Sequence, residues 1–227
     1  MASDLLVVMG ASCTAGSMPV YLKQLEDAKI DYYVKPLNPS DVGGSGGDLA
    51  YKVRTIREFA NQFNYYERIV MTDAFDVTLF CDDRDRLIQR IPTDHVLWAA
   101  EKNCYPDPSI ADKIPDRGLH RFANGGMLCG SPASLLDWCA RAEVHPMYVC
   151  NGLDQYFYNL LLSANDPLMV IDHQTELFFC LFRGYPELEF EKGYPVNTTY
   201  GTRPSFIHAN GHAGTEGMWE SHKKSLS

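Results

Sequence analysis

Short apolar runs alternate with helical segments along the first half of this chain. Leu5–Met9 contains no polar side chain, and 32–34 and 69–71 are short runs of the same kind. A strand that is apolar at every position is buried on both faces, as in a parallel sheet covered by helices. Between these runs, residues 49–63 place apolar side chains at spacings of three and four, which indicates a helix. The alternation predicts an α/β fold with a mostly parallel sheet flanked by helices.

Further elements follow from local signals. Residues 17–28 are expected to form a helix whose core side chains are Val20, Leu22 and Leu25. Asp82 or Asp83 is expected to cap a short helix that ends at Ile91. Ser131 followed by Pro132 is typical of a helix start. The later part of the chain is expected to hold strands at 95–100, 127–129 and 168–171, a helix at 153–162 and a long surface loop at 183–202.

Length and composition fit one ordinary globular domain over residues 1–227, with 45% hydrophobic and 22% charged residues. The net charge of −9 disfavours a partner held by phosphate-backbone contacts, although a local basic groove would still permit nucleic acid. No apolar run approaches the roughly 18 residues of a membrane span, and the first residues lack the basic region of a signal peptide. The seven cysteines include no CxxC pair. We therefore expect a cytoplasmic protein with reduced thiols and no membrane association.

Two acids follow the apolar run 69–71. Asp73 and Asp76 lie where the strand is expected to end, and ligands of open α/β sheets bind outside the carboxyl ends of the strands. Two carboxylates at this place can hold a divalent cation that also binds substrate phosphates. The alternative is structural: Asp73 caps a turn and Asp76 is a solvated surface acid.

Glycines mark three further stretches. Residues 10–14 form a small-residue loop where a base or ribose could approach, although they do not match GxGxxG. The segment 41–48 leads directly into a helix and is either an anion cradle or a plain linker. Lys52 and Arg54, in the first turns of that helix, either reach a diphosphate or are solvated. Asn124-Gly125-Gly126 permits a close backbone approach or positive φ.

In its ordered set of motifs the chain resembles the glycosyltransferase domain of the procollagen lysyl hydroxylases and their stand-alone relatives. The resemblance covers roughly residues 5–212. The motifs that carry it are the glycine loop before Lys52-Val53-Arg54, Thr72-Asp73-Ala74-Phe75-Asp76, Trp98-Ala99-Ala100-Glu101, Tyr105-Pro106-Asp107, Asn124-Gly125-Gly126, Asp154-Gln155, Ile171-Asp172-His173 and His208-Ala209-Asn210-Gly211. The chain departs from the family pattern at Leu153, where the family has a second acid, and at Tyr105, where it has tryptophan.

The resemblance implies a GT-A-like fold, with a nucleotide-binding half at about 1–100 and an acceptor or sugar half at about 101–215. It implies Mn²⁺, or Mg²⁺, held by Asp73, Asp76 and His208, and Asp154 as the catalytic residue near the sugar. Asp154 would look the same in sequence as a helix N-cap. The UDP-sugar is expected to contact ten residues: Gly10, Ser12, Lys52, Thr72, Asp73, Gly125, Gly126, Gln155, Asn210 and Gly211.

These residues suit glycosyl transfer, because a divalent cation neutralises the charge that develops on the departing diphosphate. The expected function is transfer of a hexose, glucose or galactose, from UDP to a hydroxyl acceptor. Two other functions stay open: a nucleotidyltransferase, and an inactive sugar-nucleotide-binding protein. A nucleotidyltransferase usually carries a basic Gly-rich loop at the first strand, and 10–16 has no Lys or Arg. Acceptors that stay open include a protein, a glycan precursor and a hydroxylated nucleobase in DNA.

Overall fold

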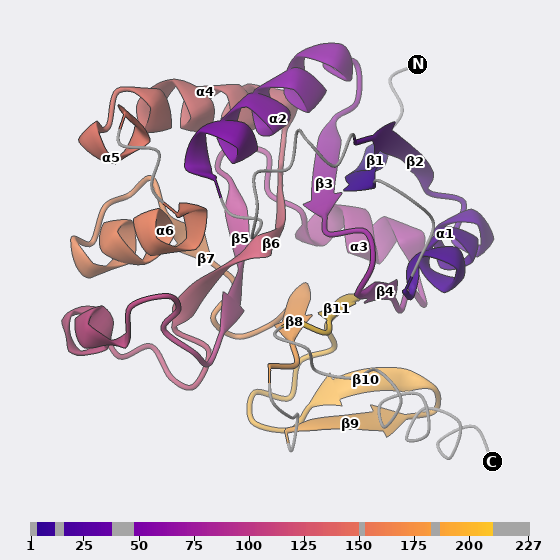
Figure 1. Ribbon diagram of the computed structural model, residues 1–227. Helices are drawn as coiled ribbons and strands as arrows, with labels where there is room; N and C mark the ends of the chain where they lie inside the picture. Colours follow the sequence, from indigo (N-terminus) through magenta and orange to yellow (C-terminus); the bar gives the residue numbers. More distant parts are fainter. Residues whose placement is uncertain (1–3, 12–15, 38–47, 150–152, 183–186, 211–227) are drawn as a thin grey trace.

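The computed structural model describes residues 4–11, 16–37, 48–149, 153–182 and 187–210 (Figure 1). Its centre is a six-stranded sheet in the order β2-β1-β3-β6-β5-β7. The strands are β1 (Leu5–Ala11), β2 (Asp31–Pro36), β3 (Arg68–Thr72), β5 (Leu97–Glu101), β6 (Phe122–Gly130) and β7 (Val170–Ile171). β6 pairs antiparallel with β3 and β5, and the other neighbours in this sheet are parallel. The predicted mixed, mostly parallel sheet is confirmed.

Helices cover both faces of this sheet (Figure 1). One face carries α2 (Leu49–Gln62), α4 (Pro132–Glu143), α6 (Asp154–Ser163) and the 3₁₀ helix η1 (Pro108–Lys113), and the other carries α1 (Met18–Asp27) and α3 (Arg84–Arg90). The short α5 (Pro146–Val149) follows α4. Successive residues of β1 enter opposite clusters, since Leu6 and Val8 pack on one face and Leu5 and Val7 on the other. This two-sided burial explains the unbroken apolar runs of β1 and β3, whereas 32–34 lies in the edge strand β2 and is only partly buried.

A second, three-stranded sheet has the order β4-β11-β8. It consists of β4 (Val77–Leu79), β8 (Phe178–Cys180) and β11 (Phe206–His208). β11 pairs antiparallel with β4, so that His208 lies opposite Val77 and the Ala209 amide donates to the Asp76 carbonyl at 2.8 Å. The last described strand is thereby fixed against the loop that follows β3.

The described part of the expected loop at 183–202 is instead a β-hairpin, so that expectation is wrong there. β9 (Leu188–Glu191) and β10 (Tyr194–Asn197) pair antiparallel around Lys192 and Gly193, whose φ angles are 51° and 84°. Two positive φ values suit the tight turn whose twist matches that of the flanking strands. Leu188 and Phe190 pack with the apolar cluster of the small sheet. Their alternation with Glu189 and Glu191 was the available signal, hidden in a Gly-, Pro- and Tyr-rich stretch.

Two smaller expectations are also corrected. Helix α1 buries Met18, Tyr21 and Leu25, while Val20 is 47% exposed and Leu22 only partly buried. Burial therefore follows the spacing of three and four residues, and Val20 lies on the outer side. Strand β6 is longer than the expected 127–129, because Asn124 to Gly126 lie inside it.

The expected cap of the helix that ends near Ile91 agrees with the structure. Asp83 caps α3 by accepting from the amides of Asp85 and Arg86. The cysteines within the described ranges, Cys81, Cys104, Cys129, Cys139 and Cys180, carry free thiols. None of the helices in those ranges combines the length and apolar character that crossing a bilayer requires.

The start of α1 holds the loop between β3 and β4. Ser17 donates from its amide to the Phe75 carbonyl at 2.8 Å, and its hydroxyl lies 3.0 Å from the Val77 carbonyl. Gly16 precedes it with φ of 59°, and a Cβ there would meet the Phe75 carbonyl oxygen. The loop that carries Asp73 and Asp76 is thus fixed by a glycine that has no room for a side chain.

We expect Gly16→Ala to destabilise the protein more than Gly201→Ala. Both glycines have positive φ, but a Cβ at Gly201 would meet nothing within 4 Å. In both variants the alanine must adopt a left-handed backbone conformation, which lowers the free energy of unfolding by about 1–2 kcal/mol. Only Gly16→Ala adds a collision with the backbone, which lowers it by about 1–3 kcal/mol more. Urea unfolding measures the difference, and equal losses for the two variants would contradict the assigned contact.

Candidate active site

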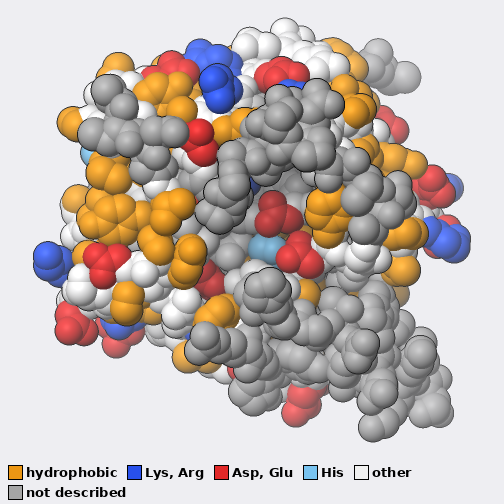
Figure 2. All heavy atoms as spheres, viewed as in Figure 1, with side chains coloured by type: hydrophobic (Ala, Val, Ile, Leu, Met, Phe, Trp, Pro, Cys, Tyr) orange, Lys and Arg blue, Asp and Glu red, His pale blue; other side chains and the backbone are white. Residues whose placement is uncertain are grey.

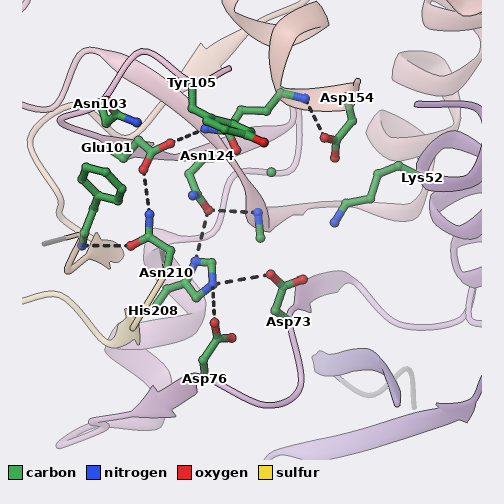
Figure 3. A pocket seen from close by; sticks show the side chains of 14 residues that line it. Lys52, Asp73, Asp76, Glu101, Asn103, Tyr105, Asn124, Asp154, His208 and Asn210 are labelled. Atoms are coloured by element: carbon green, nitrogen blue, oxygen red, sulfur yellow. Dashed lines mark hydrogen bonds and ion pairs between the residues drawn. The ribbon is translucent and has the colours of Figure 1, made fainter. Parts of the chain in front are cut away.

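A pocket of about 550 Å³ opens at the carboxyl ends of β3 and β5. Figure 2 shows acidic side chains and a histidine together in a hollow on this face, and Figure 3 shows the pocket from close by. Its lining comes from both sheets and from the starts of α2 and α6: Lys52, Asp73, Asp76, Glu101, Asn103, Tyr105, Asn124, Gly125, Gly126, Asp154, Gln155, Phe182, His208 and Asn210. This is the edge where ligands of α/β sheets bind.

Asp73, Asp76 and His208 come together at one end of the pocket (Figure 3). Their candidate ligand atoms all lie within 4.8 Å of one another. Nε2 of His208 is 3.4 Å from Oδ2 of Asp73 and 3.3 Å from Oδ2 of Asp76. Two carboxylate oxygens and one imidazole nitrogen form a donor set that suits Mn²⁺ and similar divalent cations.

The charged groups of this cluster shift one another's pKa values. Burial alone would lower the pKa of His208, but the carboxylates of Asp73 and Asp76 raise it well above its ordinary value. Burial alone would raise the pKa of Asp73, but the His208 ring and the Lys52 ammonium lower it. The two carboxylates therefore favour positive charge at the place where the ring lies. A divalent cation would replace its proton, because a ligating histidine must be neutral at the ligating nitrogen.

Gly125 and Gly126 let strand β6 form the floor of the pocket. A Cβ at Gly126 would meet the His208 ring and the Asp73 carboxylate, and one at Gly125 would meet the Asp154 carboxylate. Neither glycine has positive φ. Of the two roles considered for this pair, the close backbone approach is the one the structure shows. The space above Gly126 is thus occupied by the side chains of His208 and Asp73.

Glu101 is the pocket residue that sequence reasoning missed most clearly. It is only 2% exposed, accepts from Asn210 Nδ2 at 2.6 Å and is hydrogen-bonded by the Gln155 side-chain amide. Burial raises the pKa of Glu101 to about 7, although hydrogen bonds from Gln155, Asn210 and Asn124 oppose that shift. The available signal was an acid at the end of a buried strand, close to the pattern that singled out Asp73.

Asp154 and Lys52 form the opposite wall, where Figure 3 shows Lys52 between Asp154 and Asp73. Asp154 is the first residue of α6, while Leu153 is its N-cap, so the capping interpretation of Asp154 is wrong. Its carboxylate accepts a hydrogen bond from the backbone N–H of Gln155 at 2.6 Å. Burial raises the pKa of Asp154, and the Lys52 ammonium opposes that shift. Lys52 therefore lies where it acts on both acids.

The structure brings most of the expected site residues into the pocket: Lys52, Asp73, Asp76, Gly125, Gly126, Asp154, Gln155, His208 and Asn210. Gly10 and Thr72 do not line it. Thr72 is buried with its hydroxyl 3.2 Å from that of Tyr21, and a Cβ at Gly10 would meet Leu37. Ser12, Gly211 and the glycine segment 41–47 lie outside the described residues. Asn103, Tyr105, Asn124 and Phe182 line the pocket without having been predicted.

This fold is that of the GT-A glycosyltransferases. A glycosyltransferase involved in the glycosylation of the major capsid of PBCV-1 matches with a TM-score of 0.53 at 12% sequence identity, covering 97% of this chain and 99% of that one. The family described as the PLOD GT domain matches residues 2–216, and the chain belongs to that family. The resemblance inferred from the motifs is thereby confirmed.

Curated relatives share about a quarter of their residues with this chain over the matched segments. The multifunctional procollagen lysine hydroxylase and glycosyltransferase LH3 of Rattus norvegicus is 27% identical over 184 residues, which are 73% of this chain and 24% of that protein. The human LH3 is 26% identical over 215 residues, 84% of this chain and 28% of that protein. An uncharacterized protein of Acanthamoeba polyphaga mimivirus is 25% identical over 154 residues, 64% of this chain and 31% of that protein. The chain thus spans about a quarter to a third of the length of these relatives.

We expect Asp76→Asn and His208→Ala each to abolish binding of Mn²⁺ to the isolated protein, because each removes one member of the donor set. Calorimetric titration with Mn²⁺ measures this. His120→Ala is the matched control, since His120 is fully buried and does not line the pocket. It should lower the melting temperature and leave Mn²⁺ affinity unchanged. Normal Mn²⁺ binding by a folded His208→Ala protein would show that His208 is not a ligand.

Proposed function

We propose that this protein is a metal-dependent glycosyltransferase that moves a hexose, glucose or galactose, from a UDP-sugar to a hydroxyl acceptor. The observation that carries the proposal is the cluster of Asp73, Asp76 and His208 at the pocket of a chain from a glycosyltransferase family. Membership of that family favours glycosyl transfer over nucleotidyl transfer. The presence of all three candidate ligands also favours an enzyme over an inactive binding protein.

In this proposal one end of the pocket receives the diphosphate. Asp73, Asp76 and His208 would hold Mn²⁺ or Mg²⁺, which supplies positive charge for the phosphate oxygens of the departing UDP. Lys52, near the start of α2, would add a second positive charge for the same phosphates. Gly125 and Gly126 have no side chains, so the Asp154 carboxylate and the His208 ring lie directly against this stretch of β6, at the edge of the space that the nucleotide sugar would occupy.

The hexose would lie between the cation site and the wall formed by Glu101, Asp154 and Gln155. Carboxylates in this position accept hydrogen bonds from sugar hydroxyls and stabilise positive charge that develops at the anomeric carbon. Asp154 is held by its own hydrogen bond to the start of α6, and Glu101 is held by two side-chain amides. Both acids are therefore oriented before a substrate binds, so little reorganisation is needed during the reaction.

We expect UDP to bind far more tightly with Mn²⁺ than with EDTA, and UDP-glucose or UDP-galactose to be hydrolysed slowly with Mn²⁺ in the absence of an acceptor. A site that polarises the donor also exposes the anomeric carbon to water. Calorimetry and released UDP are the measurements, with Asp76→Asn as the control that keeps the pocket but loses a ligand. Equal UDP affinity in both buffers, or no UDP release from a panel of UDP-sugars, would contradict the proposal.

Donor turnover should also rise with pH through about 7, the pKa of the Glu101 carboxyl. The ionised form of Glu101 both accepts a proton and stabilises positive charge, and this form increases as the pH rises through the pKa. Glu101→Gln should lower kcat and remove this pH dependence. Glu187→Gln is the control, because Glu187 is also buried, lies outside the pocket and has a pKa of about 2. A rise through pH 7 that survives Glu101→Gln would assign the titration to another group.

A further inference from the structure

Asn124 lines the pocket between His208 and Glu101, and the function proposed above gives it no role. It belongs to β6, is 4% exposed and lines the pocket floor. Its side-chain oxygen lies beside the His208 ring (Figure 3), and its amide lowers the pKa of the Glu101 carboxyl. A buried amide with fixed partners on both sides has one orientation, and that orientation has consequences for His208.

The backbone determines which way the Asn124 amide points. The Gly126 N–H donates to Oδ1 of Asn124 at 2.9 Å. A backbone N–H can only donate, so the side-chain atom that it meets must be the oxygen and not the NH₂ group. The NH₂ group is then left to donate to the Glu101 carboxyl, whose pKa the Asn124 amide lowers.

The orientation of the amide determines where the His208 ring carries its proton. Nδ1 of His208 lies 3.1 Å from the same Oδ1 of Asn124. An amide oxygen only accepts, so Nδ1 must carry the hydrogen. When the ring is neutral, the lone pair is therefore on Nε2, the nitrogen that faces the carboxylates of Asp73 and Asp76. The second ring nitrogen of a metal-ligating histidine commonly makes such a contact, which sets ring orientation and ligand basicity.

We propose that Asn124 is a positioning residue for the cation site, which holds His208 in the Nδ1–H tautomer and directs Nε2 at Asp73 and Asp76. The inference rests on the proposed function, because it needs a cation at this site. It also explains why an amide suits position 124 better than a carboxylate: an aspartate would accept from Gly126 and His208 equally well, but it would place a second negative charge against Glu101.

The first test reads the tautomer directly in the wild-type protein. Zn²⁺ serves as a diamagnetic probe, and ¹⁵N-detected NMR of the histidine rings, assigned by comparison with His208→Ala, should show a proton on Nδ1 of His208 and the metal on Nε2. Metal on Nδ1 would overturn the proposal whether or not any Asn124 variant folds.

The second test uses Mn²⁺ affinity measured by calorimetry. Asn124→Ala should lower that affinity by about 10- to 100-fold, and Asn124→Asp should restore most of it because both acceptor contacts remain. Asn159→Ala is the matched control: Asn159 is fully buried and bonds the Ala123 amide and the Tyr105 carbonyl, but it does not contact His208. It should lower the melting temperature while leaving Mn²⁺ affinity unchanged.

The outcomes separate this inference from the proposed function. If wild-type protein binds no Mn²⁺, the proposed cation site itself fails. If the wild type binds Mn²⁺ and a folded Asn124→Ala protein binds it equally well, the cation site stands and the role of Asn124 is wrong. If Asn159→Ala weakens Mn²⁺ binding as much as Asn124→Ala, the effect is a general loss of packing, which also overturns the role of Asn124.

Discussion

The pairing of β11 with β4 is the contact on which the candidate site depends. The two acids lie in a loop that the chain completes early, whereas His208 comes more than a hundred residues later. The β11–β4 ladder, extended by the bond from the Ala209 amide to the Asp76 carbonyl, places the ring against both carboxylates. Gly16 and Ser17 fix the same loop from the other side. The donor set is therefore assembled by backbone hydrogen bonds, and the side chains need few adjustments of their own.

Charge helps to hold these three side chains together. The carboxylates of Asp73 and Asp76 lie close to each other and would repel each other if they were alone. Nε2 of His208 lies near both, and the two carboxylates raise the pKa of the ring, so positive charge is favoured there. Lys52 contributes a second positive charge near Asp73 and Asp154. The pocket is thereby arranged before binding, in keeping with the general need to hold ligands in place by their surroundings.

Sequence reasoning predicted the fold class because β1 and β3 are buried on both faces and are therefore apolar at every position. It did not predict that β6 is antiparallel to its neighbours, since an apolar run does not indicate in which direction a strand crosses the sheet. The hairpin β9–β10 was missed because its alternation is only four residues long and lies among turn-forming residues. Asp73 and Asp76 were found through their place after a strand. Glu101 had the same signature, yet only the folded pocket shows that Asn210 and Gln155 hold it. Asn103, Tyr105 and Phe182 follow no periodic pattern and are brought together by loops.

The order in which the strands enter the sheets also has a consequence for how the protein is made. β1, β2 and β3 pair within the first third of the chain, but β6 must insert beside β3 and β11 must add to β4 from much further along. Contacts of such long sequence separation form slowly and late. A chain in which β11 has not yet paired with β4 holds Asp73 and Asp76 without His208 beside them. The cluster of the three side chains would then form late in folding and would not guide its beginning.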